Sequence, residues 1–301
     1  MRYFFAALLL MLCPITLRAE NIAHWNLDGD LSSSSGAEEL ILSAFAGIDA
    51  SVRFAAADIE GEEITYAVID EGAALTARHG LGANGGGSYL NDYTLVIDAR
   101  FPELGDWISL YQTNSCQNGD GSTDPLACGN DGDWFLRGDG AIGISGNYGG
   151  SAPDGQWHRL ALSVDLVAGT YTSYINGERV QQNTGEGIDG RFSLGETIMI
   201  FADDNGETSG GYVSSVQIRG VALRDDEIAA FGGASAEGIP LPECIGERCC
   251  LNRQFRVNYN TESNTALCDW VSLDGDESFQ VLRDGKPLSE VLSGDTVSFE
   301  D

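Results

Sequence analysis

The chain has 301 residues and carries 46 acidic residues against 16 basic ones, a net charge of −30 at pH 7. A chain this acidic lacks the basic surface that nucleic acids require, which excludes nucleic-acid binding. Its 39 glycines, 7 prolines and many short runs of β-forming residues indicate one large all-β domain with many turns and a smaller appendage.

The first 19 residues have the pattern of a signal peptide. Arg2 is a short positive start, residues 4–12 are continuously apolar, and Ala19 supplies a small residue at a cleavage site. This run is too short to span a bilayer, and no later segment is long and apolar enough. We therefore predict a secreted, periplasmic or cell-surface protein, a buried core helix being the alternative. Without Arg2 and Arg18 the chain keeps 14 basic and 46 acidic residues, a net charge of −32.

Residues 20–240 are predicted to form one domain of strands and tight turns. Residues 93–101 are the clearest strand, with apolar residues on both faces, as in a central strand. Residues 224–231 indicate one short helix that begins with acidic residues and ends at Gly232. Further strands are expected at residues 64–69, 73–77, 107–111, 134–137, 141–144, 197–201 and 212–218.

The most informative stretch is residues 157–180. Apolar and polar residues alternate over residues 157–165 and again over residues 171–175, as in half-buried strands. Asn176-Gly177 then separates the second run from a third that begins at Glu178. An Asn-Gly pair between two β-rich runs is the strongest short-range signal for a hairpin.

Two motifs of this stretch, Gln-Trp-His-Arg at residues 156–159 and Tyr-Ile-Asn-Gly at residues 174–177, resemble the centre of a laminin-G-like, concanavalin A-like lectin/glucanase domain. The resemblance extends over most of residues 22–240 and is weak between residues 30 and 85. It implies a jelly-roll β-sandwich of two antiparallel sheets, and the alternating strands support that fold independently. It also implies an exported binding or structural module.

Pro240 and Pro242 mark a boundary, so residues 241–301 are predicted to be a separate, cysteine-rich linker and segment. A strand that ends at Trp270 and a hairpin that turns at Asp284-Gly285 resemble the middle of a fibronectin type III-like domain. Such a sandwich needs about 100 residues. We therefore expect a small and incomplete second β-sandwich here.

The cysteines predict disulfide bonds, because six of them remain after a signal peptide that contains Cys13 is removed, and export favours oxidation. Cys116 and Cys128 bracket a polar insert and are expected to pair, which would restrict a long loop. A second group could bind zinc instead, but it lacks the two Cys-x-x-Cys pairs of such sites. This group consists of Cys244, Cys249, Cys250 and Cys268.

No catalytic residues are predicted. Glycosidases of this sandwich type need two or three carboxylates that point into one cleft from a strand. Asp58, Glu60 and Glu62 have the required spacing, but Gly61 interrupts the strand, so we interpret them as solvated loop acids. The three histidines, His24, His79 and His158, lack the spacing of a helical zinc site.

Calcium is the predicted cofactor, because Asp203, Asp204 and Asn205 place several oxygen ligands in one turn after a strand. A polar β-turn without a metal is the alternative, since Asp, Asn and Gly also favour turns. A second acidic loop at residues 120–133 lacks the glycine and glutamate placement of an EF-hand.

Sugar recognition requires exposed aromatic faces. Trp107, Trp134 and Tyr148 flank predicted loops and are the candidates to stack on a glycan, whereas Trp25 and Trp157 are expected to fill the core. Combined with the resemblance, these residues predict an exported, non-catalytic module that recognises a glycan or an extracellular protein. The alternatives are an accessory domain of a larger secreted hydrolase and, third, a glucanase.

Overall fold

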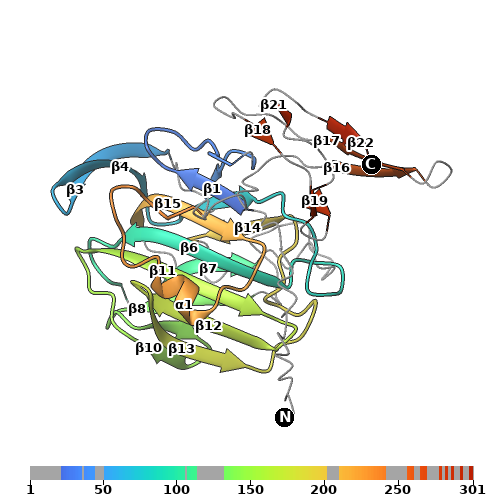
Figure 1. Cartoon of the computed structure of the whole chain (residues 1–301). Helices are drawn as coiled ribbons and strands as arrows, with labels where there is room; N and C mark the ends of the chain where they lie inside the picture. Colours follow the sequence, from blue (N-terminus) through green and yellow to red (C-terminus); the bar gives the residue numbers. More distant parts are fainter. Residues whose placement is uncertain are drawn as a thin grey trace, which may run out of the picture.

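A computed structural model describes residues 22–35, 37–44, 51–105, 107–113, 132–201 and 210–241, and the backbone of seven short strands after residue 255. The described residues form a sandwich of two antiparallel sheets (Figure 1). This architecture confirms the predicted all-β jelly-roll class. No helix in the described part of the chain has the length and hydropathy needed to span a membrane.

The first sheet has eight described strands in the order β13-β12-β11-β6-β15-β4-β3, and β1 also pairs with β15. Strands that are far apart in sequence therefore become neighbours, since β6 lies between β11 and β15. The strands are β1 (Ile22–Asn26), β3 (Arg53–Ile59), β4 (Glu62–Ile69), β6 (Asp92–Arg100), β11 (Trp157–Asp165), β12 (Thr170–Ile175), β13 (Glu178–Thr184) and β15 (Gly211–Arg219).

The second sheet has seven described strands in the order β10-β9-β8-β7-β14-β5-β2. The strands predicted for this sheet are all present, whereas β2 and β10, like β3 of the first sheet, have no counterpart in the sequence-based expectation. The strands are β2 (Ile41–Ala44), β5 (Ala73–Arg78), β7 (Trp107–Thr113), β8 (Asp133–Arg137), β9 (Ile142–Ile144), β10 (Asn147–Gly149) and β14 (Thr197–Ile200).

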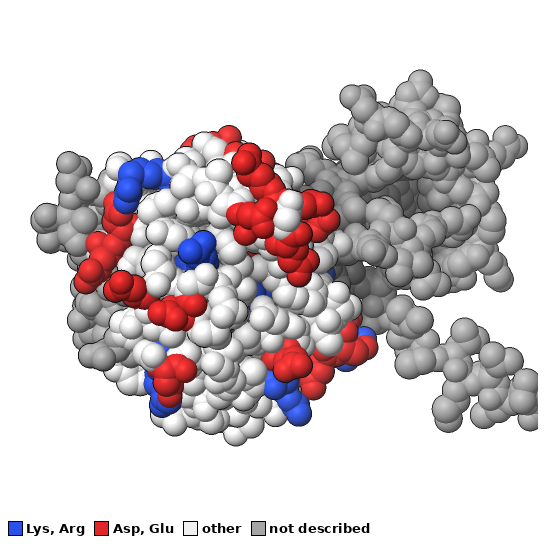
Figure 2. All heavy atoms as spheres, turned by 90° about the vertical axis from the view of Figure 1, so that its left-hand side faces the viewer, with Lys and Arg blue, Asp and Glu red and all other residues white. Residues whose placement is uncertain are grey.

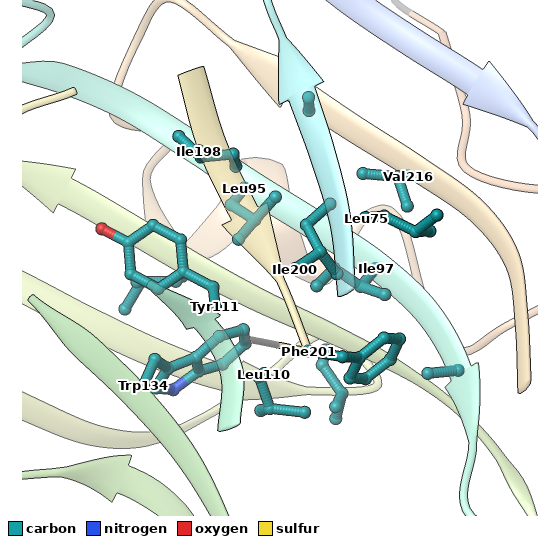
Figure 3. Packing of buried hydrophobic residues seen from close by; sticks show 14 of the residues in the cluster. Leu75, Leu95, Ile97, Leu110, Tyr111, Trp134, Ile198, Ile200, Phe201 and Val216 are labelled. Atoms are coloured by element: carbon teal, nitrogen blue, oxygen red, sulfur yellow. The ribbon is translucent and has the colours of Figure 1, made fainter. Parts of the chain in front are cut away.

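One continuous core fills the space between the two sheets. Leu95 and Ile97 of β6 point into it from the first sheet, and Leu110 of β7 and Ile200 of β14 point into it from the second (Figure 3). Each buried side chain of this size contributes roughly 1.5–3 kcal/mol relative to leaving it exposed. The core therefore fixes which residue of every strand faces inward.

The predicted hairpin at Asn176-Gly177 is confirmed. β12 pairs with β13, and Asn176 and Gly177 have φ angles of 51° and 85°. Two successive residues with positive φ form the type I′ turn that matches the twist of paired strands. The added side chain of any residue at position 177 would also meet the backbone of Ala229.

The outer face of the first sheet is covered by the segment at residues 221–239, which contains α1 (Asp225–Ala229). Leu223 and Ile228 of this segment pack on Val96 and Ala161, which lie on the outer side of β6 and β11. β6 is thus buried on both faces, as its apolar sequence predicted.

Arg159 ties this segment to the sheet from a fully buried position. Its Nε and Nη2 donate to the two carboxylate oxygens of Asp98 at 2.8 and 2.7 Å. Its Nη1 and Nη2 also donate to the backbone oxygens of Phe231 and Gly238 at 2.6 and 2.7 Å. Burial raises the pKa of the Asp98 carboxyl, and the hydrogen bonds from Arg159 oppose that rise.

The C-terminal segment forms three small sheets whose strands pair only with one another among the described residues. Arg283 pairs with Lys286, as the predicted hairpin at Asp284-Gly285 requires. The strands are β16 (Arg256–Asn260), β17 (Thr265–Asp269), β18 (Ser278–Phe279), β19 (Leu282–Arg283), β20 (Lys286–Pro287), β21 (Leu292–Ser293) and β22 (Ser298–Glu300). The fibronectin-like likeness and the boundary near residue 240 stay predictions.

We predict that Arg159→Met lowers the free energy of unfolding by about 3–5 kcal/mol, because it leaves the Asp98 carboxylate buried without a partner. Urea denaturation monitored by fluorescence measures the change. Arg179→Met is the matched control, because Arg179 is 52% exposed and its ion pair with Asp225 is solvated, so about 1 kcal/mol or less should be lost. Equal losses of stability in the two variants would contradict a special role for the buried Arg159–Asp98 pair.

We also predict an acid-sensitive contribution from His24 of β1. Its Nε2 lies 3.1 Å from Ser215 Oγ, and burial lowers its pKa from 6.5 to about 4. A lowered pKa means that His24 contributes stability above pH 6.5 and that this contribution is lost as the pH falls towards 4. The loss amounts to as much as about 3 kcal/mol.

Denaturation curves collected between pH 7 and pH 4 on the natural protein and on His24→Gln test this expectation. The variant should lose stability less steeply with acid, because it has no imidazole to protonate. Parallel curves for the two proteins would show that His24 is not the responsible group.

Candidate ligand-binding surface

Four side chains gather on the outer face of the second sheet: Trp107 of β7, Phe135 and Arg137 of β8, and Tyr148 of β10. We call this group the aromatic patch. Strand alternation places it there, because Ile108 and the neighbouring Leu136 point into the core. Trp107 and Arg137 lie directly opposite each other in the β7–β8 register.

The rings of the aromatic patch support one another. The Trp107 ring meets Phe135 edge-on, with centroids 5.9 Å apart, and lies 5.4 Å from the tilted Tyr148 ring. Trp107 is still 38% exposed, and it is one of only five large apolar residues exposed in the described part of the chain. A partly supported, solvent-facing indole offers a flat apolar face in a fixed position.

Polar groups border this apolar face. The Arg137 guanidinium lies 5.0 Å from the Tyr148 ring centroid and forms an ion pair with Asp139. Hydrogen bonding to Asp139 raises the pKa of Arg137, and the same bond lowers the pKa of Asp139. The patch therefore combines an aromatic platform with charged donors and acceptors that compensate each other.

The structure corrects the prediction for Trp134. Its side chain is fully buried between the sheets (Figure 3), and its Nε1 donates to Ser173 Oγ at 3.0 Å. Trp134 therefore cannot stack on a ligand. Phe135, the next residue, lies on the outer face instead, and sequence analysis missed it because it did not decide which side of β8 faces the core.

The two other predicted aromatic residues, Trp107 and Tyr148, are brought together, although they are far apart in sequence. Trp25 is buried in the core, as expected. Trp157 is not part of that core: it is half-buried on the outer side of the first sheet, with its ring 5.4 Å from Tyr66. The expectation for Trp157 was therefore wrong.

The other polar residues considered in the sequence lie either at an exposed turn or in buried positions beside backbone oxygens. Asp58, Glu60 and Glu62 are exposed at the turn between β3 and β4, as interpreted from the sequence. His79 and His158 are buried next to the backbone oxygens of Gly195 and Pro153, and burial lowers the pKa of both. The described residues contain no group of three or more metal-ligating side chains.

Several predictions fall on residues outside the described part of the chain. They concern the signal peptide at residues 1–19 and the calcium ligands Asp203, Asp204 and Asn205. They also concern the side chains of all the predicted disulfide cysteines: Cys116, Cys128, Cys244, Cys249, Cys250 and Cys268. These expectations stay predictions.

Two shallow depressions lie away from the aromatic patch. One, of about 530 Å³, is lined by residues before β6 and before β14, including Tyr89 and Glu196. The other, of about 380 Å³, lies between α1 and the outer ends of β11 and β12, and is lined by Asp165, Asp225 and Asp226 among others. Neither contains a residue that the sequence singled out as a ligand-binding or metal-binding candidate.

Comparison with solved structures supports the fold. The chain is similar to domain 4 of AbnA, a GH43 extracellular arabinanase from Geobacillus stearothermophilus, solved in complex with arabinotriose. The TM-score is 0.50 and the identity 18%, over 70% of this chain and 98% of that domain. At this identity the likeness concerns the fold alone.

Two further solved structures are less similar. The receptor-binding domain of botulinum neurotoxin type G has a TM-score of 0.44 and 12% identity, over 88% of this chain and 64% of that one. The CBM40 of the Ruminococcus gnavus IT-sialidase, bound to α2,3-sialyllactose, has a TM-score of 0.36 and 20% identity, over 48% and 84%.

Comparison with curated proteins found no significant match. The family model Laminin_G_3, described as the concanavalin A-like lectin/glucanases superfamily, matches residues 82–229. That segment contains the hairpin at Asn176-Gly177, the central strand β6 and the whole aromatic patch. Over residues 82–229 the chain therefore matches the concanavalin A-like lectin/glucanases superfamily.

Proposed function

We propose that this protein is an exported, non-catalytic module that binds a glycan through the aromatic patch. The observation that carries the proposal is the exposed Trp107 ring, held between Phe135 and Tyr148 and bordered by Arg137 and Asp139. Extracellular protein remains the alternative ligand, because aromatic residues and arginine are also enriched at protein interfaces.

The chemistry of the patch favours a sugar. One face of a sugar ring carries C–H groups that pack on an aromatic plane, while its hydroxyl groups need hydrogen-bond partners of both kinds. The Arg137–Asp139 pair offers donors and acceptors beside the Trp107 ring. Because the neighbouring rings already hold Trp107 in position, little side-chain freedom would be lost on binding.

The charge balance of the patch favours a neutral saccharide. The positive charge of Arg137 is compensated by Asp139, so the patch offers no free cation to an acidic sugar. The similar arabinanase domain was solved with arabinotriose, a neutral oligosaccharide, which makes arabinotriose a sensible first probe. That same likeness keeps open the alternative that this chain is an accessory domain of a larger secreted hydrolase.

The absence of catalysis is also our proposal, since the superfamily name includes glucanases. It is supported by the exposure of Asp58, Glu60 and Glu62, the acidic residues whose spacing resembles a catalytic strand. A hairpin turn in open solvent does not provide the paired and desolvated carboxylates that glycoside hydrolysis requires.

We predict that Trp107→Ala weakens binding of arabinotriose, or of another neutral oligosaccharide found on a glycan array, about tenfold, which corresponds to about 1.4 kcal/mol. Isothermal titration calorimetry measures the change. Val167→Ala is the matched control, because Val167 is 61% exposed and lies outside the patch. Unchanged affinity of the Trp107 variant would remove the patch as the site, and hydrolysis of the sugar would establish an enzyme.

We further propose, on the sequence alone, that calcium binds at Asp203, Asp204 and Asn205. A ligand of the folded state at 100 times its Kd adds about 2.7 kcal/mol to stability. Calcium should therefore raise the melting temperature, and Asp203→Asn with Asp204→Asn should abolish the rise. Asp58→Asn with Glu60→Gln makes the same charge change elsewhere and should preserve it. A melting curve that is insensitive to both calcium and chelator would contradict the proposal.

A further inference from the structure

A second cluster of aromatic and basic side chains lies on the outer face of the first sheet. In the strand register, Arg100 of β6 lies opposite Tyr212 of β15 on one side and Trp157 of β11 on the other. Tyr66 of β4 packs against both rings, with centroids 5.4 Å from Trp157 and 4.9 Å from Tyr212. We call these four residues the Arg100 cluster.

The Arg100 cluster lies beyond the part of the sheet that α1 and its flanking residues cover. Those residues pack over Val96, which precedes Arg100 on β6, and over Ala161, which follows Trp157 on β11. Arg100, Trp157 and Tyr212 are half-buried, so part of each side chain remains accessible. Figure 2 looks onto the side where β6 ends and β15 begins, and there acidic side chains gather in groups around a wide area with few charges.

Arg100 differs from every other arginine whose side chain the structure describes. Arg53, Arg78, Arg137, Arg159, Arg179, Arg191 and Arg224 each form an ion pair, and Arg219 donates hydrogen bonds to Gln217 and Pro240. Within the described residues, the Arg100 side chain forms neither an ion pair nor a hydrogen bond, and its Cζ lies 5.8 Å from the centroid of the Tyr212 ring.

This lack of a partner is unusual in so acidic a chain, which has 46 carboxylate side chains for 16 basic ones. Two donors of the cluster, Arg100 Nε and Trp157 Nε1, are also buried without any hydrogen-bond acceptor in the described structure. Buried donors are normally paired, so each unpaired one needs an explanation. These two atoms are shielded from solvent, but Nε is the only nitrogen of the Arg100 side chain that is buried in this way. Its two terminal nitrogens are therefore the donors that can meet a negatively charged acceptor beside the aromatic faces.

We propose that the Arg100 cluster is a second ligand site, specific for a saccharide that carries a carboxylate, such as a uronic acid unit. The planar guanidinium matches the two oxygens of a carboxylate, and the adjoining rings offer faces for the sugar ring. This site differs in chemistry from the aromatic patch, where Asp139 already compensates Arg137. It lies on the opposite sheet, so the two sites can be tested independently.

The test is calorimetric titration of the full chain with trigalacturonate and with its fully methyl-esterified form, which keeps the sugar backbone but lacks the charge. The acid should bind at least tenfold more tightly than the ester, and added salt should weaken its binding, because exposed ion pairs are screened. Equal binding of the two forms, or no binding of either, would overturn the proposal.

Two variants assign the effect to Arg100. Arg100→Gln should weaken trigalacturonate binding at least tenfold, and Arg100→Lys, which keeps the charge without the planar fork, should restore it only in part. Arg53→Gln is the matched control, because it removes the same charge from an exposed residue that is paired with Asp70. An Arg100→Gln protein that melts like the natural one and binds trigalacturonate equally well would refute the assignment.

Trp107→Ala separates this proposal from the proposed function. That variant should keep its affinity for trigalacturonate while it loses affinity for the neutral saccharide. Loss of both affinities in Trp107→Ala would show that there is one site, at the aromatic patch, and would reject the Arg100 cluster.

Discussion

The hydrophobic core shared by the two sheets is the constraint on which the rest of this structure depends. Side chains alternate along a strand, so once Leu95 and Ile97 of β6 are buried in that core, Val96, Asp98 and Arg100 must lie on the outer face. The same rule acts on β7 and β8 of the second sheet. Both candidate ligand surfaces therefore consist of outward-facing residues on strands whose alternate residues fill the same hydrophobic core.

What covers each outer face then decides what remains available to a ligand. On the first sheet, the buried Arg159–Asp98 pair holds the α1 segment by its carbonyl groups, and this segment seals the middle of β6 and β11. The segment does not cover the end of β6, so Arg100, Trp157 and Tyr212 stay partly accessible there. The buried Arg159–Asp98 pair thus helps to decide how much of the outer face remains accessible. The net contribution of such a pair to stability is often small.

The two surfaces contain the same kinds of residue, but they differ in whether the arginine has an acidic neighbour. In the aromatic patch the arginine has an acidic neighbour, and the exposed indole is the dominant feature. In the Arg100 cluster the arginine lacks an acidic partner among the described residues, and the adjoining rings of Trp157 and Tyr212 are half-buried. This contrast, and not the mere presence of aromatic residues, is the reason to expect neutral saccharides at one surface and carboxylate-bearing saccharides at the other.

The sequence alone determined the local features: most of the strands, the central position of β6, the turn at Asn176-Gly177 and the resemblance to the lectin/glucanase fold. These depend on periodicity and turn chemistry, which are encoded in consecutive residues. Only the tertiary structure decided that Trp134 is buried in the core while Phe135 lies half-buried on the outer face, because alternation does not reveal which face of a strand meets the other sheet. It also decided that Trp107 meets Tyr148 and that Arg100 meets Trp157 and Tyr212. Those contacts join strands that are distant in sequence, and their register is set by packing across the whole sandwich.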